Sequence, residues 1–174
     1  AEQLTTHERG LVELVYADET RPLLQGARLT AWELDRAGIA HVVQSDGAAA
    51  STILRGLVDV ALIGADRIAA NGDSANKIGS VSVALACKDA GVPFLVVAPV
   101  STVDLATENG DDIHIELRSG EEVTTLAGIR VAPANTQGFN PAFDVTPARL
   151  ISAIITEKTA IEVAQGESPK SKLH

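Results

Sequence analysis

The stretch VDVALIGAD, residues 58–66, decides the fold of this chain. Residues 58–63 are nearly all apolar, which is typical of a central strand buried on both faces of a parallel sheet. Gly64 ends the apolar run, and the carboxylate Asp66 follows it. The stretch therefore predicts a buried strand that delivers Asp66 to the rim of a sheet.

Similar apolar runs lie on both sides of this strand and alternate with helical stretches. The segments predicted as strands are residues 11–17, 41–44, 58–63 and 94–98, with an alternating pattern at 113–117 that predicts an edge strand. The segments predicted as helices are residues 24–37, 48–55 and 75–90, and one that starts at Thr146-Pro147 and continues through 150–156. Strands that alternate with helices are typical of βαβ units. The sequence thus predicts an α/β fold, a Rossmann-like parallel sheet with helices on both faces.

The composition limits the classes of function. The formal net charge is −9, and the basic residues are not clustered as they are in nucleic-acid-binding modules, so no nucleic-acid partner is expected. No apolar run reaches the roughly 18 residues of a membrane-spanning helix, so no membrane partner is expected. The single cysteine, Cys87, cannot form an intramolecular disulfide and is predicted to be a buried structural thiol in a reducing, cytoplasmic setting. The histidines lack metal-ligand spacing, and no metal site is expected.

Polar clusters follow the predicted strands, where open parallel sheets place their sites. The cluster after residues 58–63 is the most informative. Asp66 follows an apolar strand, and a carboxyl held against apolar walls has a raised pKa that suits acid–base work. Asn76 and Lys77 are predicted to begin the next helix, where free N–H groups, the helix dipole and an ammonium can hold an anion. The sequence therefore predicts a proton-transfer group and a phosphate anchor on one strand–loop–helix unit.

Each of these residues also has a structural interpretation. Asp66 could be only an N-cap or turn residue, and Lys77 only a solvated helix residue. Asp18, Glu19 and Arg21, after the predicted first strand, are interpreted as a structural ion-pair cluster.

Three long motifs in this order resemble the methylthioribose-1-phosphate isomerase family. They are residues 18–34, residues 64–79, and residues 140–147 with 154–158. The likeness runs from about residue 11 to about residue 158. The wider superfamily also includes regulatory subunits of initiation factor 2B and archaeal ribose-1,5-bisphosphate isomerases, and both stay open as alternatives: a non-catalytic regulatory or assembly subunit, and an isomerase of a different pentose phosphate.

The resemblance implies an aldose–ketose isomerase of a small sugar phosphate that needs no cofactor and forms a homodimer. Asp66 resembles the acid–base aspartate of the family, Gln25 a substrate-binding residue, and Asn76 and Lys77 substrate contacts. The family also has an N-terminal domain with a catalytic cysteine and an arginine-containing phosphate-binding segment. Neither is present in this sequence, and Cys87 is in the wrong place to replace that cysteine.

The predicted domain organisation follows from this resemblance. Residues 1–10 are expected to end a linker helix from the N-terminal domain, residues 11–165 to form the Rossmann-like catalytic domain, and residues 166–174 to form a disordered tail.

Overall fold

The computed structural model describes residues 10–173. The predicted end of a linker helix therefore lies, apart from Gly10, outside the described residues. The chain divides into two compact units. Within the described range, unit 1 contains residues 10–49 and 121–138, and unit 2 contains residues 50–120 and 139–173.

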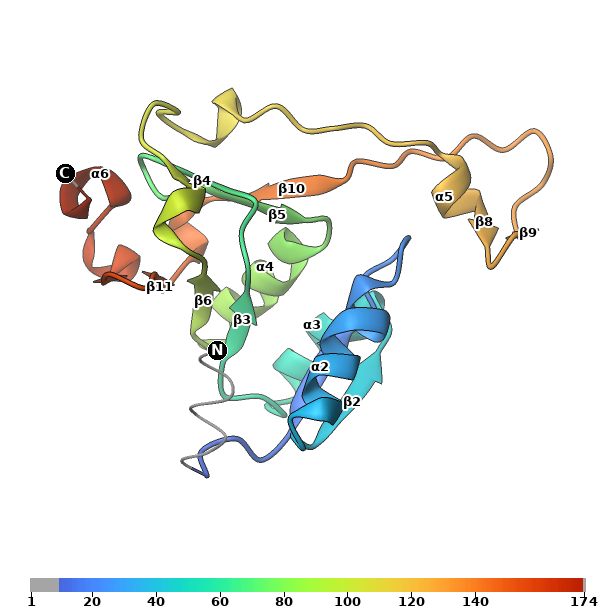
Figure 1. Cartoon of the computed structure of the whole chain (residues 1–174), viewed down its shortest axis with the longest axis horizontal. Coiled ribbons are helices and arrows are strands. Elements are labelled where there is room, and N and C mark those ends of the chain that lie inside the picture. Colours follow the sequence, from blue (N-terminus) through green and yellow to red (C-terminus); the bar gives the residue numbers. More distant parts are fainter. Residues whose placement is uncertain (1–9, 174) are drawn as a thin grey trace. The chain divides into compact units, whose positions relative to one another are not determined.

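Unit 1 is built on one βαβ connection. Strand β1 (Val15–Asp18) pairs in parallel with β2 (His41–Gln44), and the connection between them contains a π-helix (Gly26–Thr30) and α2 (Ala31–Arg36) (Figure 1). The small core is made by buried side chains from β1, α2 and the following turn: Ala17, Leu34 and Ile39. The inserted segment of unit 1 forms α5 (Glu121–Thr124) and the hairpin of β8 (Thr125–Leu126) and β9 (Ile129–Arg130).

Unit 2 holds the main core of the molecule. Strands β3 (Ala61–Ile63), β6 (Phe94–Val97) and β11 (Ala153–Ile155) pair in parallel, and β12 (Ala160–Ile161) adds an antiparallel edge. Helix α4 (Ser80–Ala90) packs on β3 and β6 (Figure 1). The core between them includes Phe94, Val96, Ile154 and Cys87, and α3 (Ala49–Leu54) contributes Ile53. The predicted α/β class with parallel strands is confirmed. The prediction that residues 58–63 form a buried central strand is wrong, because β3 covers only Ala61–Ile63, stands at the end of its sheet and leaves Leu62 43% exposed.

A second, mixed sheet of unit 2 lies beside the carboxyl end of β3. It is made of β10 (Phe143–Thr146), β5 (Ser74–Lys77), β4 (Arg67–Ala69) and β7 (Val103–Asp104) in that order. β5 is antiparallel to both neighbours, and β4 is parallel to β7. The predicted helix over 75–90 is therefore wrong in its first part, since α4 starts only at Ser80. Gly79, with φ +110°, breaks the helical conformation before it, and pairing with β10 holds residues 74–77 extended.

Three further predictions about local structure are wrong. The predicted helix over 150–156 is a short 3-10 turn, Ala148–Leu150, followed by β11, because the apolar side chains there fill the space beside β6. The predicted edge strand at 113–117 is reduced to one bridge, Leu117 to Pro141. In place of a disordered tail, residues 166–173 include α6 (Pro169–Lys172), where Pro169 is buried and the N–H of Lys170 donates to the carbonyl oxygen of Ala70.

The remaining short elements are 3-10 helices in the connections. They are Asp46–Ala48, Val100–Thr102, Gly110–Asp112 and Val163–Gln165. Among the residues described, no helix is long and apolar enough to cross a membrane.

Thr146, at the end of β10, is a stability defect that a single substitution removes. Its side chain is fully buried, and in the described structure its hydroxyl has no hydrogen-bond partner. A buried hydroxyl without a partner costs about 1–3 kcal/mol. We expect Thr146→Val, which keeps the shape and removes the hydroxyl, to raise the free energy of unfolding by about 1 kcal/mol in urea titrations.

Thr156 provides the matched control for this prediction. It is also buried, but its hydroxyl donates to the carbonyl oxygen of Thr159 at 2.9 Å and accepts from the N–H of Thr159 at 3.0 Å. Thr156→Val should therefore lower the free energy of unfolding. Equal destabilisation by both substitutions would contradict the assignment of an unsatisfied hydroxyl at Thr146.

Candidate functional site

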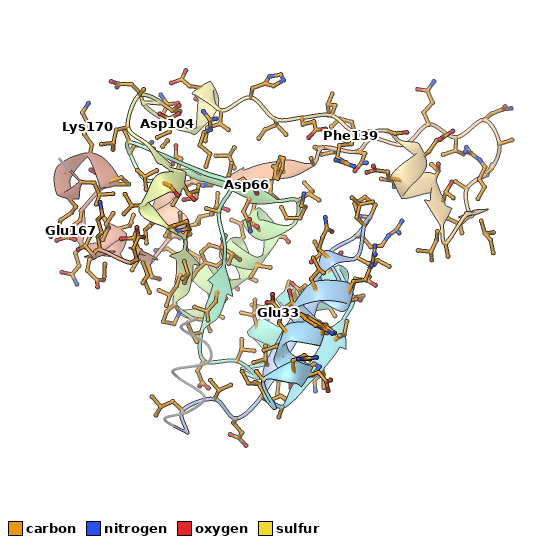
Figure 2. The ribbon with its side chains drawn as sticks, in the orientation of Figure 1. Glu33, Asp66, Asp104, Phe139, Glu167 and Lys170 are labelled. Carbon is orange, nitrogen blue, oxygen red and sulfur yellow. The ribbon has the colours of Figure 1, made fainter. Side chains whose placement is uncertain are left out.

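Asp66 lies just beyond the carboxyl end of β3, next to strand β5 (Figure 2). Its N–H donates to the carbonyl oxygen of Ala75 at 2.8 Å. The register of β4 and β5, in which Arg67 faces Ala75, places Asp66 opposite Asn76. Gly64 is also close to Asn76, since a Cβ at position 64 would lie 4.0 Å from Oδ1 of Asn76, an ordinary van der Waals distance. The end of β3 and the end of β5 thus bring Gly64, Asp66, Asn76 and Lys77 into one part of unit 2.

The electrostatics of Asp66 fit a proton-transfer group. Partial burial of the carboxyl raises its pKa above the ordinary value, and the positive charge of Lys77 opposes the rise. The residue as a whole is exposed, so the loss of hydration behind this rise is limited and the carboxyl stays open to a ligand. Asp66 is therefore an accessible carboxyl whose proton is held more tightly than in water.

Asn76 and Lys77 are held by contacts with two different elements, α4 and β10. Nδ2 of Asn76 donates to Oγ of Ser80 at 3.1 Å. The ammonium of Lys77 lies 4.2 Å from the centre of the Phe143 ring, on the paired strand β10. A cation over an aromatic face is attracted by the ring electrons, which restrains the lysine without neutralising it. Lys77 is thus a positioned cation next to Asp66.

The start of α4 does not provide the predicted anion site. The carboxylate of Asp144 accepts from the N–H of Gly79 at 2.9 Å and from the N–H of Val81 at 3.3 Å. Burial raises the pKa of Asp144, and these hydrogen bonds act in the opposite direction. The expectation that free N–H groups at a helix start join Asn76 and Lys77 in holding phosphate is therefore wrong, since a carboxylate from β10 already uses them. The sequence gives no signal for this role of Asp144, because the residue is distant along the chain from the N–H groups it binds.

Gln25 lies in unit 1, whereas Asp66, Asn76 and Lys77 lie in unit 2. It precedes the π-helix of unit 1, and its Oε1 is buried and has no hydrogen-bond partner among the described residues. An unused, buried carbonyl oxygen is an acceptor available to a ligand hydroxyl.

The loop after β1 is held by hydrogen bonds rather than by the predicted ion-pair cluster. The carboxylate of Asp46 accepts from the N–H groups of Thr20 at 2.8 Å and Arg21 at 2.6 Å. The guanidinium of Arg21 donates to main-chain carbonyl oxygens, including that of Val123 at 3.2 Å. Asp18 accepts from Nε2 of Gln44 at 2.8 Å. The prediction that Asp18 and Arg21 pair with one another is wrong, because Gln44 is the partner of the Asp18 carboxylate and main-chain carbonyl oxygens are the partners of the Arg21 guanidinium.

Asp73, in the second motif, also has a structural role. Burial alone raises its pKa, but hydrogen bonds from Asn71, Ala148 and Gly110 lower it below the ordinary value. Its carboxylate accepts from the N–H of Ala148 at 2.7 Å and of Gly110 at 2.9 Å, and so ties the β4–β5 turn to two later segments. In the part of the chain described here, no cluster of histidine, cysteine and acidic side chains could hold a metal ion.

Cys87 lies in the core of unit 2, as predicted, and is fully buried. Burial raises the pKa of the thiol to about 11. Since the thiolate is the reactive form, we expect a thiol reagent at pH 8 to label the native protein very slowly and the protein in guanidinium chloride at once. Rapid labelling of the native state would show that α4 opens from the sheet.

Together, these features define an α/β domain that presents a carboxylate, an amide and an ammonium at adjacent strand ends, an arrangement suited to proton transfer on a small anionic ligand. The chain belongs to the Initiation factor 2 subunit family, which matches residues 4–163.

Its relatives within this family include isomerases. It is 55% identical over 166 residues to a probable bifunctional methylthioribose-1-phosphate isomerase/methylthioribulose-1-phosphate dehydratase of Nocardia farcinica, an alignment that covers 95% of this chain and 30% of that protein. It is 56% identical over 155 residues to the methylthioribose-1-phosphate isomerase of Marinobacter nauticus, with 89% and 44% covered. The chain thus spans less than half the length of these curated relatives.

Two solved structures have the same fold. The 5-methylthioribose 1-phosphate isomerase of Pyrococcus horikoshii has a TM-score of 0.88 and 47% identity, with 91% of this chain and 44% of that chain covered. The translation initiation factor eIF-2B subunit delta from A. fulgidus has a TM-score of 0.88 and 38% identity, with 96% and 49% covered. The two structures match the fold of this chain equally well by TM-score, whereas the sequence identity is higher to the isomerase.

Proposed function

We propose that this chain is the C-terminal part of an aldose–ketose isomerase that converts 5-methylthioribose 1-phosphate to 5-methylthioribulose 1-phosphate in methionine salvage. The observation that carries the proposal is the carboxyl of Asp66, with its raised pKa, beside the ammonium of Lys77. The identity of 55–56% to named isomerases supports the substrate.

The proposed reaction needs a group that both donates and accepts a proton. Ring opening breaks the bond between C1 and the ring oxygen and leaves a proton on that oxygen. A hydrogen then moves from C2 to C1, and the C2 hydroxyl loses its proton as the C2 carbonyl forms. In the proposal, the carboxyl of Asp66 donates the first proton and accepts the second, so it returns to its starting form.

The other residues serve binding in this proposal. In unit 2, Lys77 carries a positive charge that can face the substrate phosphate, and Asn76 offers groups for the sugar hydroxyls. In unit 1, taken by itself, Gln25 has a buried carbonyl oxygen that can accept from a hydroxyl. No cofactor is required, because the redox change is internal to the sugar.

A turnover assay on the full-length protein tests the proposal. We expect the protein to convert 5-methylthioribose 1-phosphate and to convert ribose 1,5-bisphosphate at least about tenfold less well in kcat/KM, since a second phosphate has to replace an apolar methylthio group. Preference for the bisphosphate would favour the alternative isomerase. Absence of turnover on both sugars would favour the regulatory-subunit alternative, for which the similarity to the A. fulgidus subunit is the supporting observation.

We also propose that the protein works as a cytoplasmic homodimer. Large apolar side chains are exposed in each unit, including Ile129 in unit 1 and Phe139, 78% exposed, in unit 2. Exposed apolar surface of this kind commonly marks a site of contact with a partner protein. Sedimentation of the full-length protein at micromolar concentration should show a dimer, and a monomer would overturn this part of the proposal.

A further inference from the structure

Ser80, the first residue of α4, is a buried polar side chain to which the proposed reaction gives no role. It is 6% exposed. Its hydroxyl donates to the carbonyl oxygen of Lys77 at 2.9 Å, and its Oγ accepts from Nδ2 of Asn76 at 3.1 Å. Ser80 therefore contacts both residues of unit 2 that are proposed to bind substrate.

The direction of these hydrogen bonds determines how Asn76 is oriented. A serine hydroxyl has a single proton, and here the carbonyl oxygen of Lys77 receives it. Oγ can then only accept from Asn76, and the only part of the Asn76 side chain that donates is its NH₂ group. The Asn76 amide must turn this group toward Ser80, which directs Oδ1 away from α4.

The position of Gly64 agrees with this orientation. Oδ1 of Asn76 faces the end of β3, where a Cβ on Gly64 would be 4.0 Å away. Oδ1 of Asn76 is therefore on the side of the end of β3 and not on the side of α4. Asp66 lies two residues further along the same segment.

We infer that Ser80 is a positioning residue that fixes Asn76 as a hydrogen-bond acceptor toward the substrate, so that the site selects a sugar with a hydroxyl donor at this point. The inference rests on the proposed function for its ligand, a pentose phosphate. A sugar that lacks this hydroxyl would leave Oδ1 of Asn76 without a hydrogen-bond donor. A sugar with a carbonyl in its place would bring two acceptor oxygens together.

Ser82 offers a matched control on the same helix. Its hydroxyl donates to the carbonyl oxygen of Gly79 at 2.7 Å, and it is exposed. Ser82→Ala therefore also removes a hydroxyl from the first turn of α4. That hydroxyl bonds Gly79 and not Lys77 or Asn76, so the hydrogen bond between Ser80 and Asn76 stays in place.

The test measures kinetics of the full-length protein with 5-methylthioribose 1-phosphate. We expect Ser80→Ala to raise KM by about three- to tenfold, which corresponds to one lost hydrogen bond, while kcat stays within about twofold. Ser80→Thr, which keeps the hydroxyl, should restore KM, and Ser82→Ala should leave KM unchanged. If Ser80→Ala fails to fold, Ser80→Cys replaces it in the test. Cysteine is close to serine in size but is a much weaker hydrogen-bond donor and acceptor, so the same increase in KM is expected.

A second measurement does not depend on turnover. In ¹⁵N NMR spectra, the side-chain NH₂ protons of Asn76 should exchange with solvent faster in Ser80→Ala than in Ser82→Ala. If the wild type turns over no sugar phosphate while this difference is present, the proposed function fails and the positioning by Ser80 stands. Equal exchange in both variants, or an unchanged KM in Ser80→Ala, would overturn the inference.

Discussion

Replacing Asp66 with asparagine should lower kcat of the full-length protein on 5-methylthioribose 1-phosphate by about 10²–10⁴-fold, the loss that removal of a general acid–base group usually causes. Asparagine keeps the size and the hydrogen bond from the main-chain N–H of residue 66 to Ala75. What it removes is the exchangeable proton of the carboxyl. KM should change little, because Lys77, Asn76 and Gln25 are the proposed binding groups. Steady-state kinetics with a coupled ketose assay measures both parameters.

The pH dependence gives this experiment a second readout. Burial raises the pKa of Asp66, with Lys77 opposing, and the proposed reaction starts with this carboxyl protonated. The wild-type pH–rate profile should therefore have a limb on which activity falls as the pH rises through the pKa of Asp66, above the ordinary value of 3.8. Asp66→Asn should lose this limb. The raised pKa also means that ionisation of Asp66 opposes folding: its contribution to stability is complete below 3.8 and disappears as the pH rises through the raised pKa. Asp66→Asn should therefore not destabilise the protein at pH 7.

Lys77→Ala is the matched comparison at the same site. Removal of the cation should raise KM, because it weakens attraction for the substrate phosphate, and should also remove the charge that holds down the pKa of Asp66. The limb on which activity falls with rising pH should then move to higher pH. Near-normal turnover of Asp66→Asn would contradict the catalytic role and favour a regulatory subunit.

Replacing Gly26 with alanine should lower the free energy of unfolding by about 3 kcal/mol or more, because the new methyl group overlaps main-chain atoms that cannot move away. A Cβ at this position would overlap the carbonyl oxygen of Asp18 and lie 2.7 Å from Oγ1 of Thr20. The first contact joins the start of the π-helix to the end of β1, the strand around which unit 1 is built. Urea unfolding followed by circular dichroism measures the loss.

Gly47 is the control for this substitution. It is in the same unit, and a Cβ there meets nothing within 4 Å. Gly47→Ala should be neutral or stabilise by about 0.4–1 kcal/mol, since alanine reduces the conformational freedom of the unfolded chain. If both glycine substitutions had the same effect, the close approach at Gly26 would not be what makes glycine necessary there. Activity should fall with Gly26→Ala as well, because Gln25 is its neighbour.

The sequence alone determined the elements whose side chains are sorted by a simple local pattern. The apolar runs at 41–44 and 94–98 became parallel strands, and Cys87 became a core residue. Burial accounts for Cys87 and for residues 94–98, because burial of apolar side chains depends little on the exact partner, whereas Val42 and Val43 of the other strand stay exposed. The place of Asp66 also followed from its position after residues 58–63. The three motifs were sufficient for the family, since they run through most of the chain.

The tertiary structure alone decided which groups fix the candidate site. Residues 74–77 looked like the beginning of a helix, but pairing with β10, far along the chain, made them a strand. The same strand brings Asp144 to the first N–H groups of α4 and Phe143 under Lys77, and the turn before α4 brings Ser80 to Asn76. Local propensity cannot show these contacts, because each depends on a partner that only the folded chain brings within hydrogen-bonding or van der Waals distance.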